Sequence, residues 1–136
     1  MTVADTSGLL AFFNRREPEH QSVRRVVEGL TDPLVVSPYV IAELDYLVSE
    51  RVNADAALAV VHELAGGAYT LAAIDSADLT RAAEVIERYR DQRIGLADAS
   101  IVVLAERFGT REVLTLDHRH FDVVRPLTGG RFRLLP

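Results

Sequence analysis

The stretch TVADTSGLLAFF, residues 2–13, decides the fold class. It begins with a short apolar strand pattern, Thr2 to Asp5, and passes into a helical pattern from Gly8 to Arg15. The same alternation of a short apolar run and a longer periodic stretch continues through the 136 residues. Strands that alternate with helices predict a parallel sheet covered by helices. We therefore expect an α/β fold, with one domain over residues 1–136.

The remaining segments extend this alternation. Apolar and β-branched runs predict strands at residues 34–36, 69–73, 112–116 and 132–135, and a short one around Val123 and Val124. Helical spacing predicts a helix after Pro18 and further helices at residues 39–51, 54–65, 78–90 and 97–108. Active sites of such sheets lie beyond the carboxyl ends of the strands, so residues that follow strands deserve most weight.

Composition excludes several classes of protein. The chain has no cysteine and all 15 basic residues are arginine, which removes disulfides, thiolate metal sites, P-loop lysines and Schiff-base lysines. No apolar run is long enough to span a membrane and the start lacks a signal-peptide pattern, so we expect a cytoplasmic protein without a membrane partner. A formal net charge of −5 argues against a generic basic nucleic-acid binder.

Four acidic residues stand in unusual places. Asp5 and Asp117 each follow an apolar strand, Asp98 begins the most apolar helix, and Glu43 interrupts an apolar helical stretch. Taken singly, Asp5, Asp98 and Asp117 could be helix caps, a role that we favour over catalysis for Asp98 and hold level with it for Asp5. Glu43 alone could be a helix-dipole or surface residue. Together, and close to one another, they would need a cation to offset the cost of burying them. Oxygen ligands without cysteine favour Mg²⁺ or Mn²⁺ over zinc.

Other readings of the same residues are weaker. His118 and His120 follow Asp117, but their spacing puts them on different faces of a helix, which favours surface or substrate-side positions over a zinc site. A phosphoryl-transfer enzyme of the haloacid-dehalogenase type would have an acid at position 7, where Ser7 stands, and a later lysine. The glycine-rich dinucleotide motif and the Gly-x-Ser-x-Gly motif of serine hydrolases are both absent.

The motifs VADTS (3–7), AELD (42–45), LADA (96–99) and LTLD (114–117), in this order, resemble those of the PIN-domain ribonucleases. The likeness is closest to the VapC toxins of bacterial VapBC toxin–antitoxin pairs, and it covers essentially the whole chain. It implies a PIN-like three-layer α/β/α sandwich with a mostly parallel central sheet. It also implies a Mg²⁺- or Mn²⁺-dependent endoribonuclease that acts on structured RNA such as tRNA or rRNA.

The resemblance implies a role for each acid. Asp5 and Asp98 match the main metal ligands of the family. Glu43 and Asp117 match the acids that complete the metal site or hold metal-bound water. All four are therefore candidate catalytic residues and metal ligands, and Thr6–Ser7 matches the supporting hydroxyl residues beside the first aspartate.

RNA contacts must come from arginine, because lysine is absent. Arg93 and Arg119 are the strongest candidates, since they lie close in sequence to the proposed ligands. The resemblance further implies a homodimer and a cognate VapB-like antitoxin whose C-terminal segment occupies an apolar groove. The candidate groove residues are Phe12, Phe13, Tyr46 and Leu47.

Two alternatives remain open at this stage. The first is a non-catalytic PIN-like interaction module, which would keep the fold and lose acids, although all four acids are present. The second is a housekeeping RNA-processing nuclease, which would share the chemistry and have no antitoxin.

Overall fold

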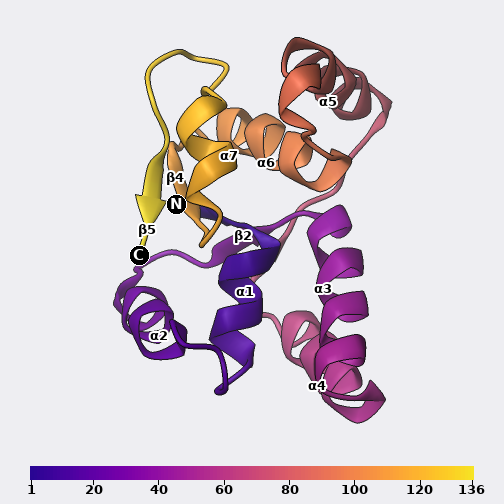
Figure 1. Cartoon of the computed structure of the whole chain (residues 1–136), viewed down its shortest axis with the longest axis vertical. Coiled ribbons are helices and arrows are strands. Elements are labelled where there is room, and N and C mark those ends of the chain that lie inside the picture. The colour runs from indigo at the N-terminus through magenta and orange to yellow at the C-terminus, as the bar shows by residue number, and fades with distance from the viewer.

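The computed structural model describes residues 1–136 and is built around a sheet of five parallel strands in the order β3-β2-β1-β4-β5. Figure 1 shows the sheet across the middle of the molecule, with β4 and β5 at one side. The two termini lie near that side. The strands are short: β1 (Thr2–Ala4), β2 (Leu34–Val36), β3 (Thr70–Leu71), β4 (Glu112–Leu114) and β5 (Arg133–Leu135).

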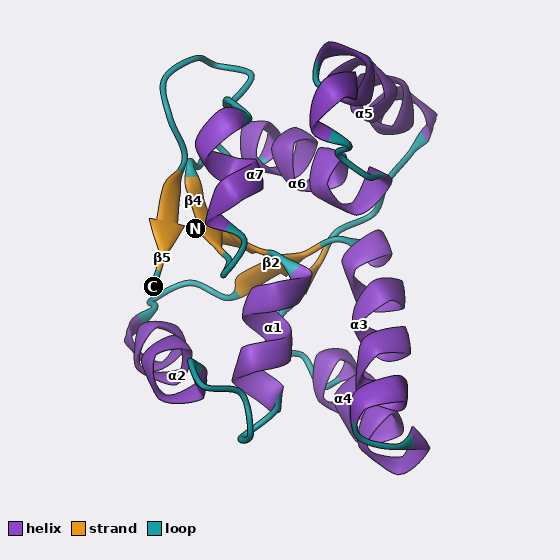
Figure 2. Ribbon diagram, viewed as in Figure 1, coloured by secondary structure: helices purple, strands orange, loops and turns teal.

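Helices cover both faces of the sheet. Figure 2 shows α1 to α4 on one face and α5 to α7 on the other, which gives three layers. The predicted α/β/α sandwich is therefore confirmed, and its sheet is entirely parallel. The α-helices are α1 (Thr6–Phe13), α2 (His20–Gly29), α3 (Pro38–Arg51), α4 (Ala54–Ala65), α5 (Ser76–Arg88), α6 (Leu96–Arg107) and α7 (His118–Val123), with a short 3-10 helix η1 (Arg90–Gln92).

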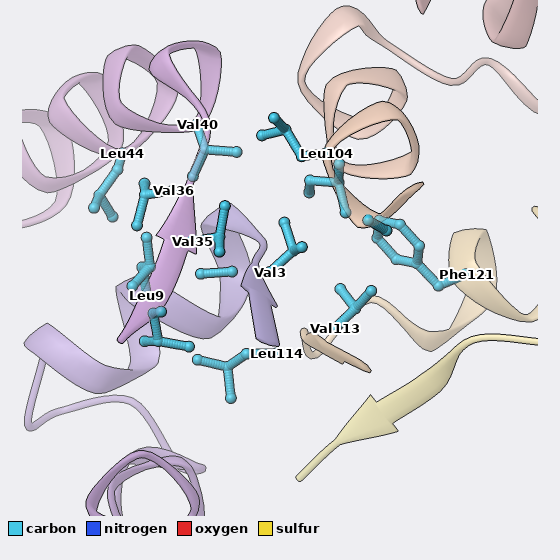
Figure 3. Packing of buried hydrophobic residues seen from close by; sticks show 14 of the residues in the cluster. Val3, Leu9, Val35, Val36, Val40, Leu44, Leu104, Val113, Leu114 and Phe121 are labelled. Atoms are coloured by element: carbon cyan, nitrogen blue, oxygen red, sulfur yellow. The ribbon is translucent and has the colours of Figure 1, made fainter. Parts of the chain in front are cut away.

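The hydrophobic core holds 29 buried residues that belong to one cluster. Valines of the three central strands lie at its middle, and leucines of the two helical layers close over them (Figure 3). The labelled core residues in Figure 3 are Val3, Leu9, Val35, Val36, Val40, Leu44, Leu104, Val113, Leu114 and Phe121.

No helix is both long and apolar enough to cross a membrane.

Most predicted elements are present within a few residues, but one is wrong. The expected strand around Val123 and Val124 does not form, because these residues end α7. The helix is explained by Asp117, whose side chain accepts a hydrogen bond from the backbone of His120 and caps the helix. Phe121 of the same helix is buried against the edge of the Phe132 ring, which supplies the packing that a short helix needs.

The order of the strands determines where a site can form. The chain runs from β1 to β2 on one side, and later returns to place β4 on the other side of β1. The direction of winding therefore reverses between β1 and β4. In open parallel sheets, ligands bind at the carboxyl ends of the strands at such a reversal. Asp5 follows β1 there, and Asp117 follows β4 by three residues.

Candidate active site

Asp5 lies at the carboxyl end of the central strand and is held by two hydroxyl groups. Ser7 Oγ and Thr115 Oγ1 both donate to Asp5 Oδ2, at 2.9 and 2.7 Å. These hydroxyls in turn accept from the backbone after β4: Leu116 N donates to Ser7 Oγ, and Asp117 N donates to Thr115 Oγ1, each at 2.9 Å. The first carboxylate is thus fixed to the segment that carries the last one.

Thr115 is a site residue that the sequence reading missed. It is fully buried and joins Asp5 to Asp117 through one hydroxyl. The available signal was a hydroxyl residue at the carboxyl end of a buried strand, directly beside the strand that carries Asp5. That pairing could not be read from the sequence, because β1 and β4 are neighbours only through the sheet.

Gly8 allows α1 to lie close to the end of β4. A Cβ atom at this position would lie 2.5 Å from the carbonyl oxygen of Leu114 and 2.8 Å from its Cγ. The same carbonyl oxygen accepts a hydrogen bond from Asp5 N at 2.9 Å. A side chain at position 8 would therefore clash with the carboxyl end of β4, whose Leu114 carbonyl group holds the backbone of Asp5.

The Asp5 carboxyl is difficult to ionise in this position. Burial raises its pKa most strongly, while the hydrogen bonds from Thr115, Ser7 and the Thr6 backbone lower it, and the charge of Asp117 raises it again. The direction of the net shift is upward. Desolvation therefore exceeds the stabilisation that the hydroxyl groups give to the carboxylate.

Asp98 lies in the first turn of α6, where the charges of the other three acids act on it. Burial, with smaller contributions from the charges of Asp5, Asp117 and Glu43, raises its pKa to about 6, against a lowering effect of His120. These four acids, which we call the acid edge, thus act on one another although they come from four segments of the chain. Asp98 is not the cap of α6, since Gly95 holds that position.

His120 is the basic side chain that lies against the acid edge. Its Nδ1 lies 3.4 Å from Asp98 Oδ2 and 3.1 Å from Asp117 Oδ2. The angles at Nδ1 do not make a hydrogen bond with either oxygen, so we treat these contacts as electrostatic. Of the two positions that we considered for the histidines, His120 takes the one beside these acids and stays partly exposed, whereas His118 is exposed on the surface.

The remaining predicted residues are less involved. Glu43 is exposed on α3 and has the smallest effect of the three acids on Asp98. Thr6 is buried, but its hydroxyl has no hydrogen-bond partner. Arg93 and Arg119 are exposed and form no ion pair: Arg93 occupies the turn after η1 with a φ of 54°, and Arg119 lies at the start of α7.

The donor atoms of the acid edge suit a hard divalent cation. All are carboxylate oxygens, and no arginine pairs with them. No three His, Asp or Glu side chains lie close enough to form a complete ligand set. Mg²⁺ does not require one, because it keeps several waters and is commonly held by one or two carboxylates. The residues present therefore fit such an ion.

A groove of about 570 Å³ lies toward the far end of α1 from Asp5. Its walls come from the end of α1, from α2, from the end of α3 and from α4. Two of the four candidate groove residues, Phe12 and Phe13, line it, whereas Tyr46 and Leu47 do not. The aromatic pair is packed edge to face at 5.2 Å between ring centroids and is only half-buried, which leaves apolar surface in the groove.

The chain is similar to proteins of known family. The model of the PIN domain matches residues 2–126. Ribonuclease VapC26 of Mycobacterium tuberculosis is 55% identical over 134 residues, which cover 98% of this chain and 99% of that protein.

Solved structures share the fold. VapC20 of Mycobacterium tuberculosis, described as a sarcin-ricin loop cleaving toxin, has a TM-score of 0.81 at 19% identity, over 86% of this chain and 90% of that one. The DNA-bound VapBC complex of Salmonella typhimurium has a TM-score of 0.71 at 20% identity, over 98% and 95%. By its fold, its family match and its relative, this chain belongs to the PIN-domain family, in the VapC branch.

Proposed function

We propose that this protein is the toxin of a toxin–antitoxin pair and a Mg²⁺-dependent endoribonuclease that hydrolyses phosphodiester bonds in RNA in the cytoplasm. The observation that carries the proposal is the acid edge itself. The negative charges of Asp5, Asp117 and Glu43 disfavour ionisation of Asp98, and no arginine neutralises them. A divalent cation would remove this repulsion, and the 55% identity to a VapC ribonuclease supports the reaction.

Asp5 and Asp98 would bind Mg²⁺ directly, and Glu43 and Asp117 would hold its waters. Mn²⁺ suits the same oxygen donors. When bound, the ion supplies positive charge for the scissile phosphate and acidifies a water for in-line attack. Ser7 and Thr115 keep Asp5 oriented by holding its Oδ2. Asp117 or Glu43 would accept the proton of the attacking water.

Arg93 and Arg119 would bind the RNA backbone. Both are exposed, free of ion pairs and close in sequence to the acid edge, so their guanidinium groups are available for paired contacts with phosphate. We propose a structured RNA such as tRNA or rRNA as substrate, because specific RNA recognition generally targets unpaired loops. The sarcin-ricin loop named for VapC20 is a target of this kind.

The groove beside Phe12 and Phe13 would receive the C-terminal segment of a VapB-like antitoxin. Its apolar aromatic pair suits the apolar face of a peptide, and Arg15, Arg24, Glu28 and Glu63 give it a charged rim of both signs. Solved relatives include complexes of VapB with VapC. We also propose a homodimer, on family likeness alone.

Cleavage of RNA by the purified protein tests this proposal. We expect cleavage with Mg²⁺ and none with EDTA, and we expect Asp5→Ala to be folded and inactive. Mapping of new 5′ ends in cellular RNA after brief expression then identifies the target. An Asp5→Ala protein that cleaves RNA at the wild-type rate would contradict the assignment of the site.

The two alternatives differ in their tests. A non-catalytic module would show no Mg²⁺-dependent cleavage at all. A housekeeping nuclease would cleave RNA, but its gene would lack a neighbouring reading frame for a small DNA-binding protein. Co-expression with such a neighbour should abolish cleavage if the protein is a toxin, and should leave it unchanged otherwise.

A further inference from the structure

A chain of three hydrogen bonds runs from the start of α3 to the start of α6, and one of them, between Ser37 and Ser100, joins the two helices. Tyr39 N donates to Ser37 Oγ at 3.2 Å, and Ser37 Oγ lies 2.7 Å from Ser100 Oγ. Ser100 Oγ donates to the carbonyl oxygen of Ala97 at 2.6 Å. Both serines are buried, at 0% and 1% exposure, among otherwise apolar neighbours of the core.

The direction of this chain is determined by its two ends. A carbonyl oxygen can only accept, so Ser100 gives its one proton to Ala97. Ser37 must then give its own proton to Ser100, while its oxygen accepts from Tyr39 N. Each hydroxyl is thus satisfied once as a donor and once as an acceptor. A fully satisfied buried network favours one arrangement of the helices, whereas apolar contacts tolerate sliding.

The chain of hydrogen bonds starts at Ser37, which lies at the same carboxyl end of the sheet as Asp5. Ser37 directly follows β2, Asp5 follows β1 and Thr115 follows β4, and the strand register puts these three residues level. Thr115 binds the Asp5 carboxylate from one side. Ser37, on the other side, reaches α6 instead. Asp5 and the helix that carries Asp98 are therefore both hydrogen-bonded to residues that follow neighbouring strands at the carboxyl end of the sheet.

Ser100 and Ala97 stand on either side of Asp98 in the first turn of α6. We infer that Ser37 and Ser100 are positioning residues, which hold the Asp98 carboxylate beside Asp5 so that the two can share one divalent cation. The inference rests on the proposed function, because it assumes the metal. Neither serine touches the ion; each acts through the placement of α6.

Mn²⁺ binding, measured by electron paramagnetic resonance of the free ion, tests the inference without a substrate. We expect Ser100→Ala and Ser37→Ala each to weaken Mn²⁺ binding about tenfold, the lower end of the effect of losing an outer partner of a metal ligand. The double variant should be no weaker than the weaker single variant, because both act through one bond. Val60→Ala on α4, far along the chain from this bond, is the control: it should lower the Tm and keep the wild-type affinity.

The outcomes separate the inference from the proposed function. If Ser100→Ala binds Mn²⁺ as tightly as the wild type while its Tm falls like that of the control, the serines are merely structural and the inference is wrong. If the wild type itself binds no Mn²⁺, the metal-dependent function fails first, and the inference with it. Should Ser100→Ala not fold, the double variant leaves no unpartnered hydroxyl and allows the same comparison.

Discussion

The acid edge and the contact between α5 and α6 differ in whether their carboxylates are paired with arginine. At the α5–α6 contact, Arg81 Nη2 lies 2.6 Å from both oxygens of Glu106, and Arg107 Nη1 lies 3.0 Å from Asp78 Oδ2. Arg107 also binds the carbonyl oxygen of Ala73 at 2.7 Å. Each acid there has its own arginine. The four carboxylates of the acid edge have no arginine, and only Asp98 and Asp117 lie near a histidine, His120.

This difference shows which acids serve the fold. The acids of the α5–α6 contact are satisfied within the protein and join two helices. Those of the acid edge repel one another, and all but Glu43 are buried or partly buried, which costs free energy in the metal-free protein. Neutralising an acid should therefore weaken the fold at the first place and strengthen the metal-free fold at the second.

The largest effect should come from Asp98→Asn compared with Glu106→Gln. The first removes a proposed metal ligand, and we expect RNA cleavage to fall at least about a thousandfold, since metal catalysis contributes several kcal/mol. The second leaves the acid edge intact and should keep cleavage within about twofold. Single-turnover cleavage rates at saturating Mg²⁺ check both. Equal losses in the two variants would show that the acid edge has no special role.

Gly8→Ala should disturb the acid edge without changing its charge. The new methyl group would meet the Leu114 carbonyl oxygen at 2.5 Å, so α1 or β4 must move. We expect the free energy of unfolding in urea to fall by about 2–3 kcal/mol, as in other overpacked sites. Gly29→Ala is the matched control, because no atom lies within 4 Å of its added Cβ, and it should be neutral or slightly stabilising.

The stability of the metal-free protein should decrease as the pH rises through about 6. The pKa of Asp98 is about 6 in the fold against 3.8 in the unfolded chain, so the folded state binds this proton more tightly. The stabilisation is complete below pH 3.8 and is lost above pH 6, by about 1–2 kcal/mol once partial exposure is allowed for.

Urea unfolding at pH 4.5 and 7.5, with EDTA present, measures this loss. Asp98→Asn should reduce the difference between the two pH values, although the raised pKa of Asp5 leaves a remainder of the same sign. Adding Mg²⁺ at pH 7.5 should raise the free energy of unfolding of the wild type, and should not raise that of Asp98→Asn. A wild-type protein that is more stable at pH 7.5 than at pH 4.5 under these conditions would contradict the account.

The smallest effect should come from Arg81→Met. The Arg81 side chain is 43% exposed, so its ion pair with Glu106 is well screened by solvent. We expect a loss of about 0.5–1 kcal/mol in the free energy of unfolding, and a smaller one in 0.5 M salt. RNA cleavage should be unchanged. A loss of cleavage would mean that the α5–α6 contact controls the placement of Asp98.

The sequence predicted the fold well where hydrophobic pattern and local chemistry agree. The β-branched run at residues 34–36 and the alanine-rich helix at residues 54–65 were found with the same bounds. Val123 and Val124 were misread as a strand, because β-branched residues favour strands while the cap at Asp117 and the burial of Phe121 favour a helix. The cap and the burial of Phe121 together outweighed the strand propensity of two residues.

The site was predictable only in part. The four acids could be named because three of them follow or begin an element, Glu43 interrupts an apolar helical stretch, and the family motifs fall on all four. The hydroxyl of Thr115 and the ring of His120 could not be placed, since their contacts with Asp5 and Asp98 join segments 110 and 22 residues apart. Such contacts depend on the order of strands in the sheet, which the sequence pattern leaves open.

The position of β4 beside β1 also has a consequence for the timing of synthesis. The bond from Thr115 to Asp5 spans 110 residues, and β1 lies between its neighbours β2 and β4. While the chain is being made, β1 and β2 can pair early, but Asp5 gains the Thr115 hydroxyl and its neighbour Asp117 only after β4 has emerged. We expect nascent chains that end before β4 to be inert toward RNA. The ribosome would therefore complete β4 and the segment that carries Asp117 before the nuclease could act on any RNA nearby.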